Sequence, residues 1–302
     1  MPPSDTITRP TRSLQGKVAI VTGAGALLGG IGNGRATAIL LAEDGCFVIC
    51  ADLKRNLAEG TVRLIEQEGH GKAIAVEADV TKAEDCKHLI DIALSEYGRL
   101  DILVNNVGVT GPKGNSVDVD MQAFMSGLEI NVASMIQMAK YAIPVMAQNE
   151  GQYAGAIVNM SSVAGLLGGT PNILYPTSKG AIVNMTRAMA ANHAGQRIRV
   201  NCVCPGKRPF PMLFWNMLIS LGMVYTPMMY GGKRMSENER AVRKSRSLLQ
   251  TEGNGWDVAS AIRFLASDQS RWMTGVVLPV DAGTTAATGI GLQGLHDSTS
   301  SN

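Results

Sequence analysis

A tyrosine and a lysine stand four residues apart in the stretch Tyr175-Pro176-Thr177-Ser178-Lys179. This spacing places a phenol and an ammonium group on one face of a helix. A free tyrosine has a pKa of about 10, which is too high for a good base at neutral pH. A nearby ammonium group favours the phenolate and lowers that pKa, so the pair can move a proton to or from an alcohol or carbonyl oxygen. The spacing alone is weak evidence, because it occurs by chance in many chains.

A glycine-rich stretch from Thr22 to Gly34 directly follows the first predicted strand and opens a helix. Glycine lets a backbone turn tightly and approach a pyrophosphate, and a helix N-terminus offers free N–H groups with a partial positive charge. Asp52 ends the second predicted strand, where its carboxylate can accept hydrogen bonds from both adenosine ribose hydroxyls. Together these features predict a dinucleotide-binding site.

The residues after the second and third strands bear on which dinucleotide binds. The Asp52 carboxylate would repel a 2′-phosphate, so NAD is the expected cofactor and NADP the alternative. Lys54 and Arg55 could serve such a phosphate, or they are solvated charges at a helix start. Asp79 and Val80 are expected to border the adenine, although an Asp-Val-Thr sequence also suits a helix cap.

Short apolar runs alternate with helical stretches, which is typical of a parallel sheet with crossover helices. The predicted strands are Val18–Thr22, Phe47–Ala51, Ala73–Glu77, Ile102–Asn105, Ala156–Met160, Arg199–Val203 and Val276–Val280. The predicted helices are Gly34–Asp44, Leu57–Glu68, Ala83–Tyr97, Gln122–Ala147, Pro176–His193 and Asp257–Ala266. The pattern predicts an α/β fold: a single doubly wound, parallel, seven-stranded sheet with helices on both faces, or Rossmann-like. We expect a flexible arm (1–13), one dinucleotide-binding catalytic domain (14–288) and a flexible tail (289–302).

Composition excludes several classes of function. The chain has 302 residues, of which 17% are charged, and its net charge is +2, so nothing suggests a nucleic-acid surface. No apolar run reaches the length of about 18 residues that a membrane span needs, and the first sixteen residues lack the apolar core of a signal peptide. The five cysteines show no metal-ligand spacing, so we expect buried thiols, no metal and a cytoplasmic location.

Further motifs accompany the tyrosine, the lysine and the glycine turn. They are Asn105-Asn106-Val107-Gly108, Asn131 on a long predicted helix, Ser162 thirteen residues before Tyr175, Pro205-Gly206, and Asp281-Ala282-Gly283. With them, the chain resembles a short-chain dehydrogenase/reductase of the single-domain type from about Leu14 to Thr285.

The resemblance implies a role for each residue that matches a family motif. Tyr175 is then the general acid/base, and Lys179 binds the nicotinamide ribose and, with the oxidised ring, keeps the Tyr175 pKa low. Ser162 hydrogen-bonds the substrate oxygen, and Asn131 supports a water-linked proton path to Lys179. The expected cofactor contacts are Gly23, Gly32, Gly34, Asp52, Asp79, Val80, Asn106, Gly108, Tyr175, Lys179, Pro205, Gly206 and Thr226.

The glycine turn departs from the family pattern, being about five residues longer. Alignment to the helix start makes Gly32 and Gly34 the second and third family glycines, whereas alignment to Gly30-Ile31-Gly32 makes them Gly30 and Gly32. We favour the first register, because the helix start fixes where a phosphate sits.

The sequence after Pro205-Gly206 departs further. The family motif Pro-Gly-x-Val-x-Thr-Pro-Met reappears only when Lys207–Gly222 is removed, which makes Thr226 the threonine that touches the nicotinamide carboxamide. We therefore interpret 207–222 as an apolar insertion. It is a lid over the substrate pocket, a surface that docks on a partner subunit or membrane, or a retained intron, since Gly206-Lys207-Arg208 can be encoded by a sequence with a eukaryotic splice-donor consensus.

The expected function is NAD-dependent interconversion of a secondary alcohol and a ketone, with a small apolar substrate and a role in secondary metabolism. An NADPH-dependent ketoreductase is one alternative, and a dinucleotide-binding scaffold without turnover is another. The long helix and the Tyr175 helix carry apolar faces that, by resemblance, join subunits into a homodimer or homotetramer.

Overall fold

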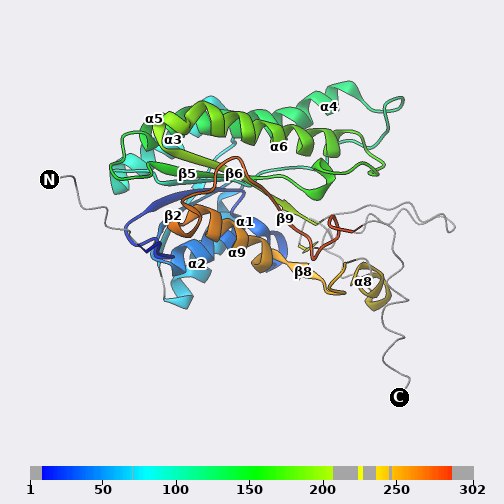
Figure 1. Ribbon diagram of the computed structural model, residues 1–302, viewed down its shortest axis with the longest axis horizontal. Coiled ribbons are helices and arrows are strands. Elements are labelled where there is room, and N and C mark those ends of the chain that lie inside the picture. Colours follow the sequence, from blue (N-terminus) through cyan, green and yellow to red (C-terminus); the bar gives the residue numbers. More distant parts are fainter. Residues whose placement is uncertain (1–8, 70, 207–223, 227–235, 245–246, 288–302) are drawn as a thin grey trace, which may run out of the picture.

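A computed structural model describes residues 9–69, 71–206, 224–226, 236–244 and 247–287 of the chain. Seven strands form one sheet in the order β3-β2-β1-β4-β5-β6-β9, and every neighbouring pair is parallel (Figure 1). The strands are β1 (Val18–Thr22), β2 (Phe47–Asp52), β3 (Lys72–Glu77), β4 (Ile102–Asn105), β5 (Gly155–Met160), β6 (Ile198–Pro205) and β9 (Val277–Val280). The predicted doubly wound, Rossmann-like sheet is confirmed.

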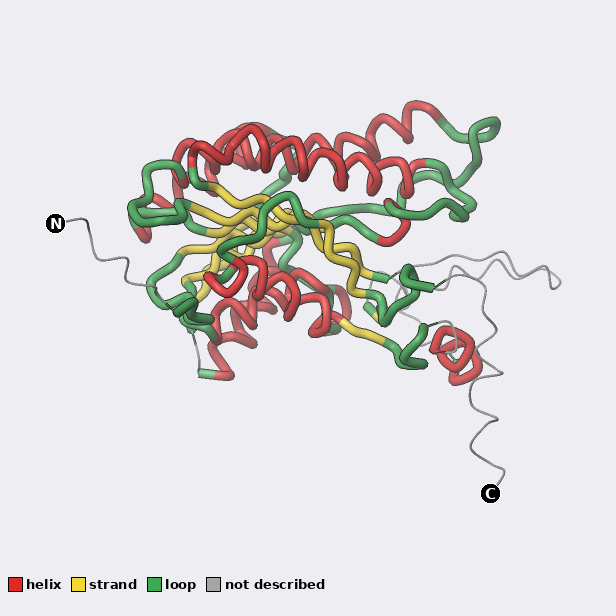
Figure 2. Tube along the Cα trace, in the orientation of Figure 1, coloured by secondary structure: helices red, strands yellow, loops and turns green. Residues whose placement is uncertain are grey.

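Helices cover both faces of this sheet (Figures 1 and 2). One layer holds α3 (Ala83–Tyr97), α4 (Met121–Leu128), α5 (Ser134–Met146) and α6 (Leu174–His193); the other holds α1 (Asn33–Glu43), α2 (Arg55–Glu68) and α9 (Gly255–Ala266). The central strands β1, β4, β5 and β6 are buried along their whole length. Strands covered on both sides need near-continuous apolar residues, which is why their sequences do not alternate.

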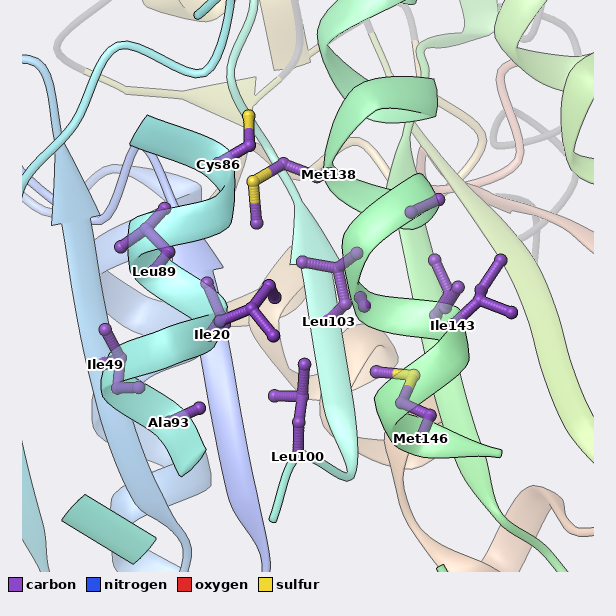
Figure 3. Close-up of a cluster of buried hydrophobic side chains, with 14 of the residues drawn as sticks. Ile20, Ile49, Cys86, Leu89, Ala93, Leu100, Leu103, Met138, Ile143 and Met146 are labelled. Atoms are coloured by element: carbon purple, nitrogen blue, oxygen red, sulfur yellow. The ribbon is translucent and has the colours of Figure 1, made fainter. Parts of the chain in front are cut away.

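The apolar core lies on both sides of the sheet. Under α3 and α5, side chains such as Leu89, Leu103 and Met138 pack against Ile20 and Ile49 of β1 and β2 (Figure 3). Each such buried aliphatic side chain stabilises the fold by about 1.5–3 kcal/mol. The core therefore fixes where the carboxyl ends of the strands lie, and with them the residues that follow each strand.

The predicted helix over Gln122–Ala147 is continuous but not uniform. Asp120 caps its start by accepting from the Gln122 and Ala123 N–H groups, and a π-helical turn over Glu129–Ala133 separates α4 from α5. Such single π turns within α-helices occur mostly at functional sites. Asn131 lies in this turn.

Two strands and one α-helix near the end of the chain were not predicted. A short parallel pair joins β7 (Val224–Tyr225) to β8 (Gly253–Asn254), and α8 covers Glu237–Lys244. The predicted insertion 207–222, the tail 289–302 and the first eight residues of the arm lie outside the described residues. Within the described ranges, no helix is both long and apolar enough to cross a membrane.

Candidate active site

A cavity of about 410 Å³ opens at the carboxyl ends of the central strands. The chain crosses from β1 to β2 on one side and from β4 to β5 on the other, so the cavity lies where the strand order reverses. Open α/β sheets bind ligands at this point. Twelve residues predicted from the sequence line it: Gly23, Gly32, Gly34, Asp52, Asn106, Gly108, Ser162, Tyr175, Lys179, Pro205, Gly206 and Thr226.

The glycine turn forms one end of the cavity. Gly23 has a positive φ of 63°. A Cβ atom on Gly34 would lie 2.1 Å from the Gly23 carbonyl oxygen, so only glycine fits there. Gly32 caps α1 and borders open space, with Ala26 Cβ 3.8 Å from its would-be Cβ as the nearest atom. Gly30 is not among the lining residues, so the structure is consistent with the register that selects Gly32 and Gly34.

A buried arginine, which the sequence analysis did not single out, holds the enlarged turn in place. Arg35 donates to the carbonyl oxygens of Gly30 at 2.9 Å and Ala26 at 3.3 Å, and to Thr61 Oγ1 at 3.0 Å. Thr61 in turn donates to the Ala24 carbonyl oxygen at 2.7 Å. Burial lowers the pKa of the Arg35 guanidinium, and the charge of Asp52 acts in the opposite direction.

Asp52 lies at the edge of the cavity with its carboxylate fixed by the backbone. Its Oδ2 accepts from the Gly25 N–H at 2.9 Å and its Oδ1 from the Lys54 N–H at 3.1 Å. The Arg55 side chain pairs with Glu59 at 3.1 Å instead of facing Asp52. The predicted acidic residue is therefore in the cavity.

Asp79 and Val80 are not brought to the cavity wall. The Asp79 carboxylate accepts from the Thr81 N–H and hydroxyl, and the hydroxyl bond lowers its pKa. Val80 is buried in the core beneath α3. Asp85 also accepts from the Asp79 N–H, so this stretch makes the turn that opens α3.

Tyr175 and Lys179 both lie on α6, one turn apart, and reach the cavity. The Lys179 Nζ lies 5.7 Å from the centre of the Tyr175 ring and donates to the Met160 carbonyl oxygen at 2.9 Å. Ser162 follows β5, and its side chain hydrogen-bonds that of Tyr175. The serine, the phenol and the ammonium group thus meet although they come from two different elements.

The protein's own groups raise the pKa of Tyr175. Burial is the largest cause, the hydrogen bond with Ser162 lowers the pKa, and the neighbouring Cys204 raises it further. The sequence predicts that Lys179 and an oxidised nicotinamide lower this pKa. In the protein alone the direction is the opposite, because desolvation of a phenolate outweighs the other contributions.

Asn131 lies behind the cavity wall and is fully buried. Its Nδ2 donates to the Val109 carbonyl oxygen and to Ser178 Oγ, both at 2.9 Å, and its Oδ1 accepts from the Val109 N–H at 2.7 Å. A Cβ on Gly108 would lie 3.2 Å from Lys179 Nζ and 3.4 Å from Asn131 Oδ1. The Asn131 side chain therefore ties the loop after β4 to α6 beside Lys179.

Gly206 and Thr226 complete the wall although twenty positions separate them. Thr226 is buried and directly follows β7, which pairs with β8. The start of α9 is close to the glycine turn as well: a Cβ on Gly255 would lie 3.0 Å from the Ile31 and Gly32 carbonyl oxygens.

Several lining residues were not predicted from the sequence. They are Gly25, Ala26, Leu27, Asn33, Leu53, Leu57, Val107, Met160 and Ser161. Most flank a predicted residue, so proximity in sequence to Gly23, Asp52 or Ser162 was the available signal.

Comparison with known proteins identifies the family. Residues 17–212 match the family described as short chain dehydrogenase, and residues 217–285 match the one described as enoyl-(acyl carrier protein) reductase. The chain therefore belongs to the short-chain dehydrogenase family. The break between the two matches, at 213–216, falls within the predicted insertion.

Individual relatives cover almost the whole chain. A cis-4-hydroxycyclohexanecarboxylate dehydrogenase of Sinomonas cyclohexanicum is 34% identical over 89% of this chain and 97% of its own length. A 2-(S)-hydroxypropyl-CoM dehydrogenase of Xanthobacter autotrophicus is 37% identical over 90% and 98%. The structure of a 7α-hydroxysteroid dehydrogenase complexed with NADH and 7-oxo glycochenodeoxycholic acid superimposes with a TM-score of 0.76, at 31% identity over 90% and 95%.

Proposed function

We propose that this oxidoreductase interconverts a secondary alcohol and a ketone with NAD as its cofactor and Tyr175 as general acid/base. The observation that carries the proposal is the cavity itself. Ser162, Tyr175 and Lys179 line the same cavity as the glycine turn and Asp52. Nicotinamide, when bound, supplies the carbon that accepts or gives a hydride.

The residues present fit a dinucleotide. Gly34 lets the start of α1 pack against the Gly23 carbonyl oxygen, where any side chain would collide, and Gly32 places the N-terminus of α1 at the cavity. A helix N-terminus favours negative charge, which a pyrophosphate carries. Asp52 supports NAD over NADP, because its carboxylate would repel a 2′-phosphate. Arg35 is committed to backbone carbonyl groups and does not support NADP, so Lys54 and the exposed Arg55 are the cations that the NADP alternative would use.

Each catalytic side chain has a role that follows from its position. The Tyr175 phenolate takes the proton of the substrate hydroxyl, and the phenol returns it to the carbonyl oxygen in the reverse direction. Ser162, which already hydrogen-bonds Tyr175, orients the substrate oxygen. Lys179, held by the Met160 carbonyl oxygen, places its positive charge near the phenol and is positioned to bind ribose hydroxyls. Asn131 supports this arrangement through Ser178 and the loop at Val109.

We infer a small apolar alcohol or ketone as substrate. The relatives named for cis-4-hydroxycyclohexanecarboxylate and for a 7α-hydroxysteroid act on secondary ring alcohols. In the described part of the cavity, Val107 and Met160 contribute apolar side chains to the lining. A place in secondary metabolism and a cytoplasmic location belong to the same proposal.

The test is turnover of a panel of secondary alcohols with NAD and with NADP at equal concentration. We expect oxidation with NAD, and a loss of at least ~100-fold in kcat/KM in Tyr175→Phe with NADH binding retained. Tyr141→Phe, on α5 outside the cavity wall, is the matched control and should keep full activity. A chain that binds NADH but oxidises no alcohol would instead be a dinucleotide-binding scaffold, and faster turnover with NADP would make it an NADPH-linked ketoreductase.

We also infer that residues 14–288 act as one catalytic domain and that the protein is a homodimer or homotetramer. The support for assembly is the exposed apolar surface of α4 and α5. Met121, Met125 and Ile136 are 60%, 59% and 50% exposed along this continuous helix. Large apolar side chains aligned on one surface commonly mark a protein interface.

A further inference from the structure

Asn33 occupies an unusual position in the glycine turn. It is the first residue of α1, lies between Gly32 and Gly34, and lines the cavity. Its backbone carbonyl oxygen accepts from Thr37 Oγ1 at 2.7 Å, an ordinary contact within the helix. Its side-chain oxygen, in contrast, has no hydrogen-bond partner among the described residues.

The two ends of the Asn33 carboxamide differ in their surroundings. The Oδ1 atom is buried without a hydrogen-bond partner among the described residues. The Nδ2 atom is not among the buried unpaired atoms and bonds to none of the residues that the structure describes. A buried oxygen without a hydrogen-bond partner lowers the stability of the folded chain, so stability does not explain why an asparagine stands here. The group that remains accessible is an N–H donor on the wall of the cavity.

We propose that the Asn33 side chain is an additional contact of the dinucleotide, with Nδ2 donating a hydrogen bond to a pyrophosphate oxygen. This inference rests on the proposed function. The first turn of α1 already presents free backbone N–H groups, and a side-chain donor adds to them at the same end of the helix. A hydrogen bond to a charged phosphate oxygen is about twice as strong as one between neutral groups.

Two substitutions at Asn33 separate binding from folding. The dissociation constant for NADH is measured by fluorescence titration without substrate, and the melting temperature is measured on the free chain. Asn33→Ala should bind NADH roughly tenfold more weakly, because it removes the donor without adding bulk. Asn33→Asp should bind more weakly still, because its charge faces the pyrophosphate, and added salt should reduce that deficit.

The free chain should respond in the opposite direction. Asn33→Ala removes the unpaired oxygen without adding a charge, so its melting temperature should stay the same or rise. Asn149→Ala is the matched control. The Asn149 Nδ2 donates to the Leu100 and Ala154 carbonyl oxygens at 2.7 and 2.8 Å, so its loss should lower the melting temperature and leave NADH binding unchanged.

The outcomes distinguish this inference from the proposed function. Unchanged or tighter NADH binding by Asn33→Ala, while the natural chain binds NADH, overturns the role of Asn33 alone. A lower melting temperature together with weaker binding assigns Asn33 a structural role and also overturns it. Failure of the natural chain to bind NADH or NAD overturns the proposed function.

Discussion

Tyr175 is kept neutral by its surroundings, because burial and Cys204 outweigh the hydrogen bond from Ser162. A neutral phenol is the form that gives a proton to a carbonyl oxygen, whereas alcohol oxidation needs the phenolate. In the proposed mechanism, the positive charge of oxidised nicotinamide would lower this pKa when the cofactor is bound. The proposal would thereby link the direction of catalysis to the redox state of the cofactor.

A pH titration tests this linkage. In the free chain the Tyr175 phenol should ionise above its ordinary pKa of about 10, measured as the ultraviolet difference between the natural chain and Tyr175→Phe. NAD should lower that pKa and NADH should not. By linkage, NAD affinity should rise as pH increases, because the phenolate prefers the positively charged ring, while NADH affinity should not rise. An unchanged Tyr175 titration with NAD present would contradict this account.

At the scale of the elements, two glycines at the start of α1 line the cavity and differ in their surroundings. Gly34 sits where the start of α1 crosses the backbone after β1, and a side chain there would collide with the Gly23 carbonyl oxygen. Gly32 faces the cavity with space around it. We therefore propose that Gly34 is required for packing and Gly32 for access of the dinucleotide.

Alanine at each position should separate the two roles. Gly34→Ala should destabilise the fold by about 1–3 kcal/mol, because the 2.1 Å contact is with backbone and forces a shift of the turn. Gly32→Ala should leave stability within about 0.5 kcal/mol and weaken NADH binding. Denaturant unfolding and NADH titration measure the two effects. If Gly32→Ala unfolds as readily as Gly34→Ala, the assignment of the two glycines is wrong.

Much of the fold and of the candidate site could be predicted from local sequence patterns. Features that depend on contacts between elements could not. The sheet follows from apolar runs, the pairing of Tyr175 with Lys179 from their spacing on a helix, and Ser162 from the resemblance to the family. The bonds from Arg35 to Thr61 depend on how α1 packs on α2, which no spacing reveals. The π turn at Asn131 leaves the helical pattern of the sequence intact, and Asp79 suited both an adenine contact and a turn. The direction of the Tyr175 pKa depends on burial, which is a property of the folded molecule.

At the scale of the whole molecule, α4 and α5, which carry these exposed apolar side chains, belong to the same helical layer as the Tyr175 helix α6 (Figure 1). Burying them against a second copy would remove apolar surface from water and brace α6 from outside. Assembly would then stabilise the element that positions Tyr175 and Lys179.

Charge on that surface should dissociate the protein. The natural chain is expected to sediment as a dimer or tetramer, and a double variant, Met125→Glu with Ile136→Glu, as a monomer, because two charges would have to be buried at the interface. Leu94→Glu changes a 40% exposed side chain on α3 and serves as the control that keeps its assembly. Analytical ultracentrifugation decides, and equal masses for the natural chain and the double variant would refute the interface.

Gly206 and Thr226 lie on the same cavity wall although they are twenty positions apart in the sequence. The chain leaves the cavity wall at one residue and rejoins the same wall at the other. The entropy cost of closing a loop grows slowly with chain length, by only about 0.6 kcal/mol for each doubling. A change in the number of residues between Gly206 and Thr226 should therefore cost the fold little and leave Ser162, Tyr175 and Lys179 where they are.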